Sequence, residues 1–285
     1  MITNASLTTY LHGVAASVAP SIYDKPDPAR TWGISISPWS HLIDWQKFKA
    51  AGGTFAIIKM IDGVQVAPYA EANYKAAKDA DVLVGGYGWL YTAAKLSPGA
   101  QARALVAFLK DHPCDIRPGP DFEWNTSGNP TFDDLYGYTQ PFADGYGKPA
   151  MPYTAPGYWN DPKQIKSGSQ LGPKSPYWAT LPLWAAEYRT KNSAYIPFGL
   201  WAQCKILQFS ATGQGALYGY PTDGEKEAEL NYWQGSLADL LAWCGSATVP
   251  PVVPPPVVAP PTVETLEQLT ADVADIKARL TKGGL

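Results

Sequence analysis

Short apolar segments alternate with helix-like segments through most of this chain of 285 residues, and this alternation constrains the fold more than any other feature. The strand-like segments are residues 32–36, 55–59, 82–90, 121–124, 151–154, 183–188 and 205–210. The clearest helix candidates are residues 42–51, 69–80 and 98–112. Repeated strand-then-helix units predict a parallel sheet with right-handed crossovers. Seven or eight such units over about 215 residues favour an α/β fold, an irregular (β/α)8 TIM-like barrel, over an open sheet.

The composition divides the chain into four predicted parts. Residues 1–30 form an irregular N-terminal extension, and residues 31–245 form the barrel. Residues 246–262 are a Pro-rich linker, which is stiff and has no core of its own. In residues 263–285, apolar positions follow heptad spacing, at Leu266, Leu269, Val273, Ile276 and Leu280. This pattern predicts a short amphipathic helix, which is either marginal by itself or, as we prefer, self-associates or docks onto another protein.

Charge, cysteine usage and hydropathy exclude several classes of protein. The net charge is −3 and there is no basic run, so no nucleic-acid partner is expected. The three scattered cysteines, Cys114, Cys204 and Cys244, form neither a disulfide framework nor a metal-ligand pattern, and we expect no metal and no cofactor. No apolar run approaches the roughly 18 residues that span a bilayer. The N-terminus lacks a positively charged segment, so no secretory signal is expected.

The segment Asp121-Phe122-Glu123 follows the breaker run Pro118-Gly119-Pro120 and carries the clearest chemical signal. In an extended segment, side chains at i and i+2 share a face, with Cβ atoms roughly 6–7 Å apart. Paired carboxyls of this kind carry out glycoside hydrolysis, in which one is protonated and the other ionised. The alternative is a strand end whose acids face solvent. Eleven Trp and seventeen Tyr residues are compatible with a carbohydrate cleft, because aromatic rings stack on sugar faces.

A series of short motifs runs from Trp32 to Gly235. The motifs are Trp32-Gly-Ile-Ser-Ile-Ser-Pro-Trp39, Ile43-Asp-Trp45, Lys49-Ala-Ala-Gly52, Phe55-Ala-Ile-Ile-Lys59, Gly86-Tyr87, Asp121-Phe-Glu123, Pro152-Tyr-Thr154, Leu183-Trp184 with Tyr188, Leu207-Gln-Phe-Ser210 and Glu229-Leu-Asn231. No single motif is specific, but their order resembles that of the glycoside hydrolase family 25 lysozymes (N-acetylmuramidases), common in bacteriophage endolysins and bacterial autolysins. The resemblance implies an irregular (β/α) barrel that hydrolyses the β-1,4 bond between N-acetylmuramic acid and N-acetylglucosamine in peptidoglycan.

The resemblance also implies roles for individual residues. Glu123 would be the general acid that protonates the leaving oxygen, and its pKa must be high for that role. Asp121 would stay ionised and would orient the substrate N-acetyl group or stabilise the oxocarbenium-like transition state. Glu229 would be a third catalytic carboxylate. The candidate substrate-binding residues are Ser35, Tyr87, Trp89, Tyr153, Trp184, Tyr188 and Gln208.

Two departures from the family pattern affect the acidic cluster. The family usually has an aspartate where this chain has Ser35, and its late Asp-Leu-Asn is Glu229-Leu-Asn231 here. The loss of one negative site weakens the repulsion that keeps an acid protonated, so activity is expected to be reduced or altered. Because the first and last strands of a closed barrel are neighbours, we expect Glu229 near Ser35. Asp223 and Glu227 are the alternative sources of this charge.

The function expected from this resemblance is a peptidoglycan hydrolase. The alternative is a weakly active or inactive protein that binds cell-wall glycan or forms a structural part of a phage particle. We expect a phage-encoded protein that acts on the bacterial cell wall, held in the host cytoplasm before release or associated with the virion. Residues 263–285 would then serve self-association or virion docking.

Overall fold

The computed structural model describes residues 25–166, 169, 171–188 and 194–245. The expected linker and C-terminal helix, residues 246–285, lie outside the described residues, as does most of the N-terminal extension. The strands are β1 (Trp32–Ile36), β2 (Phe55–Asp62), β3 (Gln65–Val66), β4 (Leu83–Trp89), β5 (Gly119–Asp121), β6 (Tyr153–Thr154), β7 (Trp184–Ala186), β8 (Ile206–Gln214) and β9 (Glu227–Trp233).

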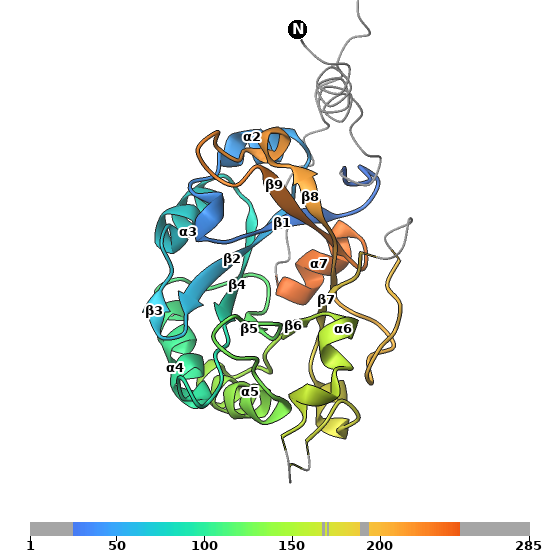
Figure 1. The fold of residues 1–285 in the computed structure, drawn as a ribbon. Helices are drawn as coiled ribbons and strands as arrows, with labels where there is room; N and C mark the ends of the chain where they lie inside the picture. Colours follow the sequence, from blue (N-terminus) through green and yellow to red (C-terminus); the bar gives the residue numbers. More distant parts are fainter. Residues whose placement is uncertain (1–24, 167–168, 170, 189–193, 246–285) are drawn as a thin grey trace, which may run out of the picture. The chain divides into compact units, whose positions relative to one another are not determined.

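These strands form a closed barrel (Figure 1). The order around it is β1-β9-β8-β7-β6-β5-β4-β2, and pairing of β1 with β2 closes the ring of eight strands, while β3 adds to the edge of β2. The expected TIM-like barrel is therefore confirmed. Within the ring of eight, one strand departs from the expected parallel arrangement, because β9 runs antiparallel to both β1 and β8. The chain returns from β8 through a short 3-10 turn, η4 (Gly215–Tyr218), without the helical crossover that a parallel strand requires.

Helices cover the barrel unevenly. The helices are α2 (Trp45–Ala50), α3 (Ala70–Asp79), α4 (Pro98–Leu109), α5 (Phe132–Tyr146), α6 (Pro156–Trp159) and α7 (Leu237–Cys244), with 3-10 turns η1 (Pro38–Ser40), η2 (Pro162–Gln164) and η3 (Pro176–Thr180). The long helices α3, α4 and α5 follow β3, β4 and β5, whereas short helices and 3-10 turns follow β1 and β6. No helix of the described segments is long and apolar enough to cross a membrane.

Two helix boundaries show how local chemistry decides where helices begin. The expected helix at 42–51 starts only at Trp45, because the Asp44 side chain accepts a hydrogen bond from the Lys47 backbone N–H and caps the helix. Helix α5 was not expected from the sequence, since Gly137, Pro141 and Gly145 interrupt its pattern. It begins at a capping box formed by Thr131 and Asp134.

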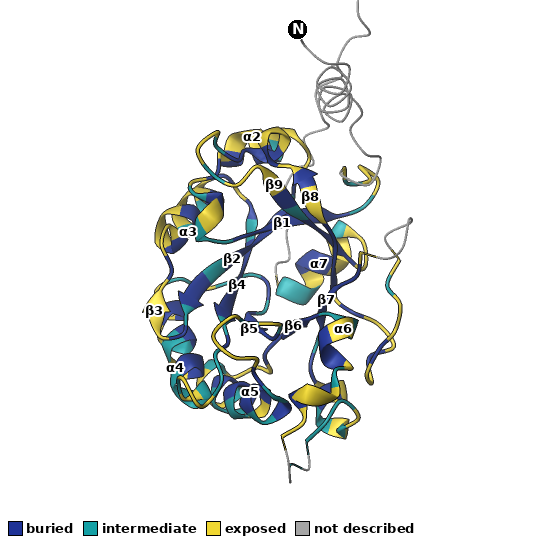
Figure 2. Cartoon of the chain, in the orientation of Figure 1, coloured by how far each residue is buried: buried dark blue, intermediate teal, exposed yellow. Residues whose placement is uncertain are grey.

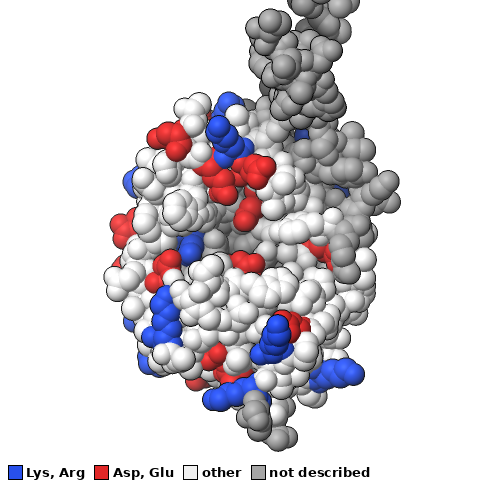
Figure 3. All heavy atoms as spheres, in the orientation of Figure 1, with Lys and Arg blue, Asp and Glu red and all other residues white. Residues whose placement is uncertain are grey.

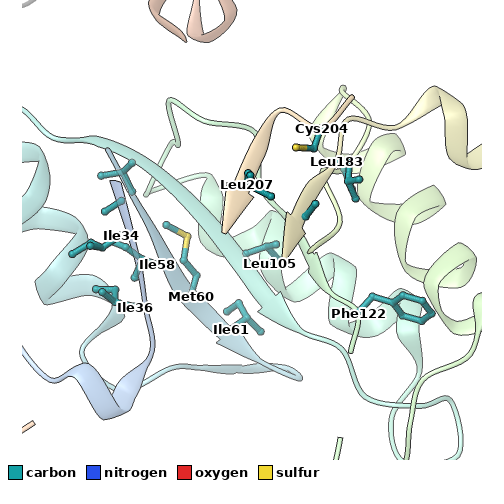
Figure 4. Close-up of a cluster of buried hydrophobic side chains, with 14 of the residues drawn as sticks. Ile34, Ile36, Ile58, Met60, Ile61, Leu105, Phe122, Leu183, Cys204 and Leu207 are labelled. Atoms are coloured by element: carbon teal, nitrogen blue, oxygen red, sulfur yellow. The ribbon is translucent and has the colours of Figure 1, made fainter. Parts of the chain in front are cut away.

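Alternate side chains of the strands fill two separate apolar layers, as the two-residue strand period requires. Outward-facing side chains pack against the surrounding helices, and Figure 4 shows several of them, including Ile34, Ile58, Met60 and Leu207, together with Leu105 of helix α4. Inward-facing side chains form the second layer, which contains Phe55, Ile57, Tyr87, Met151, Tyr153, Trp184, Ile206, Trp233 and Leu240. The strands are buried, whereas the outer faces of the helices are exposed (Figure 2).

Leu240 shows which end of the barrel is closed. This residue belongs to α7, and it packs with Trp233 and Phe55, which lie at the end where the parallel strands begin. Helix α7 therefore fills the N-terminal end of the barrel. The opposite end, where the parallel strands finish, is the end at which barrel enzymes place their active sites.

Candidate active site

Strand β5 delivers Asp121 and Glu123 to the C-terminal end of the barrel. The strand ends at Asp121, and Glu123 follows two residues later. Between them, Phe122 is fully buried on the other side of the chain, where its ring contacts the rings of Phe132, Tyr158 and Trp159. The burial of Phe122 in the outer layer turns both carboxyls toward the barrel mouth, as the i, i+2 spacing predicts.

Glu229 joins this end of the barrel from strand β9. It is the register partner of Ser35 on β1, and the Ser35 hydroxyl donates a hydrogen bond of 2.8 Å to Glu229 Oε2. The adjacency of these two residues, expected from the neighbouring first and last strands, is therefore observed. The alternative carboxylates lie elsewhere, because Glu227 is exposed and the Asp223 side chain is 80% exposed, 3.7 Å from His41.

Gln208 on strand β8 holds Ser35 and Glu229 together. Its side-chain amide donates to Ser35 Oγ at 3.0 Å and to Glu229 Oε2 at 3.1 Å. Its carbonyl oxygen Oε1 accepts from the hydroxyl of Tyr153 at 2.8 Å and from the hydroxyl of Tyr188. Because the two tyrosines occupy Oε1, the amide nitrogen must face Ser35 and Glu229, which fixes the orientation of the group.

A second amide completes this network. Asn231 Nδ2 donates to Ser35 Oγ at 3.0 Å, and Asn231 Oδ1 accepts from the indole Nε1 of Trp184 at 2.8 Å. Trp184 in turn packs against Tyr153 and Tyr87, with ring centroids 4.5 Å and 5.8 Å away. Tyr87, Tyr153 and Trp184 are thus buried beneath the carboxyl groups and support them, while Tyr188 is about half exposed at the mouth.

Lys59, within strand β2, supplies positive charge to this site. Its ammonium lies 3.3 Å from Asp62 Oδ2 and 4.6 Å from the ring centroid of Trp89, and its charge acts on both Asp121 and Glu123. Lys59 and Asn231 stand in two of the sequence motifs, but neither was predicted to be a site residue. Lys59 could have been, because it follows Phe55 and Ile57 on the same face of one strand, and a charged residue there implies that the barrel interior becomes polar at that point. Acidic side chains gather in the middle and upper middle of the molecular surface that Figure 3 draws.

Burial raises the pKa values of all three carboxyls, and repulsion from neighbouring carboxylates adds to each shift. Burial first, then the charges of Glu123 and Glu229, raises the pKa of Asp121 well above its usual range, although Lys59 opposes the shift. Burial and the charge of Glu229 raise the pKa of Glu123 to about 7. Burial also raises the pKa of Glu229 to about 7, against the hydrogen bonds from Ser35 and Gln208. The pKa values of Asp121 and Glu123 are thus both raised, and the two carboxyls are close enough for the charge of Glu123 to disfavour ionisation of Asp121.

One polar atom of the site has no protein partner. Among the described residues, Oδ1 of Asp121 is buried and accepts no hydrogen bond. An orphaned buried acceptor is costly, so an atom of this kind is suited to receive a hydrogen bond from a ligand. No group of His, Cys, Asp and Glu residues in the described part of the chain is arranged to hold a metal ion.

The raised pKa values predict that the protein loses stability as the pH rises. A carboxyl with a higher pKa in the folded than in the unfolded protein favours folding fully below its unfolded pKa, and this contribution is lost as the pH rises through its folded pKa, here about 7 for Glu123 and Glu229. We expect Tm to fall by at least a few degrees between about pH 5 and about pH 8, as measured by calorimetry. Glu229→Gln removes one of the groups and should flatten this slope, whereas Glu227→Gln, on the exposed part of β9, should preserve it. A Tm that stays constant or rises over this range would contradict the assignment.

Comparison with known proteins identifies the family. The profile of glycosyl hydrolases family 25 matches residues 34–216, and the chain belongs to this family. It is 28% identical over 243 residues to Lysozyme M1 of Streptomyces globisporus, covering 81% of this chain and 76% of that protein.

Solved structures show the same fold. The bacterial lysozyme from Streptomyces coelicolor has 23% identity and a TM-score of 0.60, covering 76% of this chain and 98% of that one. The family GH25 lysozyme from Aspergillus fumigatus has 20% identity and a TM-score of 0.58, covering 75% of this chain and 98% of that one.

Proposed function

We propose that this family 25 glycoside hydrolase is an N-acetylmuramidase, which cleaves the β-1,4 bond between N-acetylmuramic acid and N-acetylglucosamine in bacterial peptidoglycan. The observation that carries the proposal is the cluster of Asp121, Glu123 and Glu229 at the C-terminal end of the barrel, in which burial and like charge raise the pKa values. Carboxyl groups poised near neutral pH are what proton transfer to a glycosidic oxygen requires.

Glu123 is the proposed general acid. It gives its proton to the oxygen between the two sugars, while the bond from that oxygen to C1 of the N-acetylmuramic acid ring breaks. Charge develops on C1, and the carbonyl oxygen of the neighbouring acetamido group closes onto C1 to form an oxazolinium ring. Glu123, now ionised, takes a proton from the water that opens this ring, which restores the acid.

Asp121 is proposed to bind the acetamido group during this step. Its unpartnered Oδ1 can accept the acetamido N–H, which becomes more acidic as the oxazolinium ring forms. A hydrogen bond to the ionised form favours ionisation. A substrate bound in this way would favour the ionised form of Asp121, and the negative charge of Asp121 would in turn help to keep Glu123 protonated.

We propose further that Glu229 replaces the family aspartate that is missing at Ser35. The longer Glu229 side chain reaches across from β9 to within 2.8 Å of the Ser35 hydroxyl, so a negative charge stands beside the first strand although its own residue is neutral. Ser35 acts as a donor to Glu229 and as an acceptor for Gln208 and Asn231. In this arrangement the carboxylate that β9 retains, on a side chain one methylene longer than the family aspartate, compensates for the carboxylate lost from β1, and its repulsion on Glu123 is maintained.

This arrangement changes the expected effect of restoring the family aspartate. The resemblance by itself suggests that Ser35→Asp would preserve or raise activity. In this site, however, the carboxylate that the substitution introduces cannot donate to Glu229 once it is ionised and would repel it, so we expect a loss of lytic activity of about ten-fold or more. The double variant Ser35→Asp with Glu229→Asp restores the family pattern and should recover most of that loss. Initial lytic rates of the two single variants and the double variant form a double-mutant cycle that measures this coupling. If the effects of Ser35→Asp and Glu229→Asp on the lytic rate simply multiply, the proposed compensation of Ser35 by Glu229 is contradicted.

The proposed function is tested with purified peptidoglycan. We expect the protein to lower the turbidity of a cell-wall suspension and to release fragments whose reducing end is N-acetylmuramic acid, identified by borohydride reduction and mass spectrometry. Fragments that end only in N-acetylglucosamine would assign a different bond. Binding to the wall without release of fragments would support the alternative, a glycan-binding protein.

A further inference from the structure

Two tryptophans at the open end of the barrel, Trp39 and Trp124, are exposed. Trp39 is 76% exposed and Trp124 is 52% exposed. Both follow the C-terminal end of a barrel strand: Trp39 lies in turn η1 directly after β1, and Trp124 follows Glu123 after β5. A tryptophan offers a large contact area at a low cost in conformational entropy, so an exposed and well-oriented indole beside an active site is suited to bind a ligand.

Trp124 is held in place by its neighbours, although half of it is exposed. Its ring and that of Tyr158 form a T-shaped pair, with centroids 5.2 Å apart and an interplanar angle of 79°. Tyr158 is itself buried and donates a hydrogen bond of 2.6 Å to the carbonyl of Pro130. Gly157 leaves room for the indole, since a Cβ at that position would lie 3.1 Å from Trp124 Cη2. The indole is therefore oriented before any ligand arrives.

Trp39 is fixed through its backbone. Its N–H donates to the Ser37 hydroxyl at 3.2 Å, and its carbonyl accepts from the Glu225 N–H at 2.8 Å. The capping box formed by Ser37 and Ser40 closes the turn around it. The backbone of Trp39 is thus fixed within η1 and by a hydrogen bond to the segment that leads into β9. Its side chain extends into solvent.

The topology places these two indoles on different sides of the carboxyl cluster. In the order of strands around the barrel, β1 and β5 are separated by β2 and β4 in one direction and by β9, β8, β7 and β6 in the other. Glu229 lies on β9, beside the strand that leads to Trp39, while Asp121 and Glu123 lie beside Trp124. A chain molecule that crosses the mouth over the three carboxyls would pass both tryptophans.

We propose that Trp39 and Trp124 are stacking platforms for sugar rings on either side of the cleaved bond. The ligand class is a β-1,4-linked chain of N-acetylated hexosamines, whose rings present apolar C–H faces that pack against an indole. The inference rests on the proposed function, because a polymer held over Asp121 and Glu123 must continue beyond the two sugars that react. These platforms make the protein selective for long glycan strands over short fragments.

The test measures binding in the Glu123→Gln background, where glycan is retained uncleaved. Kd is determined by calorimetry for uncrosslinked glycan strands and for the disaccharide fragment. We expect Trp39→Ala and Trp124→Ala each to weaken the binding of long strands about ten-fold, and to weaken binding of the disaccharide much less. The combined variant should lose about a hundred-fold, because the two sites are separate. Trp39→Phe and Trp124→Phe, which keep a ring, should recover part of the loss.

Tyr136→Ala is the matched control. Tyr136 is 38% exposed on helix α5, where it packs against Tyr177, and it does not belong to a segment that directly follows a barrel strand, so its removal should leave binding unchanged. Far-ultraviolet circular dichroism and Tm establish that each variant is folded. If long strands bind and the tryptophan variants bind them as tightly as the parent, the inference is overturned while the proposed function stands. If the Glu123→Gln protein binds no glycan of either length, the proposed function fails and this inference fails with it.

Discussion

Replacing Glu123 by glutamine is expected to lower the lytic rate by at least about two orders of magnitude, the usual contribution of a positioned general acid. Glutamine keeps the size of the side chain but has no acidic proton to give to the leaving oxygen. Folding should be preserved, because the substitution also removes a carboxyl whose pKa burial raises to about 7 and whose ionised form is therefore disfavoured. Initial rates of turbidity loss with purified peptidoglycan measure the effect, and Tm measures the folding.

The pH dependence of the lytic rate and a control variant test whether Glu123 acts as the acid. Because the acid must be protonated, lytic activity of the parent protein should fall as the pH rises through about 7. Glu227→Gln, an exposed carboxylate on β9 outside the cluster, should keep nearly the full rate. If Glu123→Gln lyses walls at close to the parent rate, then Asp121 or Glu229 is the acid, and the same substitution at each of those residues identifies which.

Truncating Phe122 to alanine is expected to destabilise the protein by about 3–5 kcal/mol, the range for a fully buried phenylalanine. The side chain is 0% exposed and contacts Phe132, Tyr158 and Trp159, with ring centroids 5.6, 4.9 and 6.1 Å away. Its removal leaves a cavity between β5 and the helices that cover it. The free energy of unfolding in guanidinium chloride measures this loss.

The same substitution tests how the catalytic carboxyls are positioned. Phe122 lies between Asp121 and Glu123, so loosening it should also lower the lytic rate at temperatures where the variant is folded. Phe122→Leu fills more of the cavity and should cost less stability and less activity. Leu217→Ala, at a position that is 42% exposed, should change stability by less than about 0.5 kcal/mol. A loss below about 1 kcal/mol for Phe122→Ala would show that the aromatic cluster does not hold β5 in place.

The sequence was sufficient for those features that depend on local patterns. Apolar segments with a two-residue period gave the strands, and β1 has the predicted bounds. The spacing of Asp121 and Glu123 around one apolar residue placed both carboxyls on one side, because alternation in extended chain is a property of the backbone itself. Closure of the barrel also followed from the number of repeated units. Helix α5 was not predicted, because the glycine and proline residues within it obscure the helical periodicity of its apolar positions. The helix is stabilised by its capping box and by its packing against α4.

The tertiary structure decided the charge balance of the site. Ser35 and Glu229 are separated by 194 positions in the sequence, and only the antiparallel pairing of β9 with β1 brings the hydroxyl within 2.8 Å of the carboxylate. The sequence by itself indicated a missing carboxylate at Ser35, whereas the folded chain places the longer Glu229 side chain beside it. The raised pKa values have the same origin, because burial depends on what covers a side chain and like-charge repulsion depends on distance, and neither is encoded in neighbouring residues.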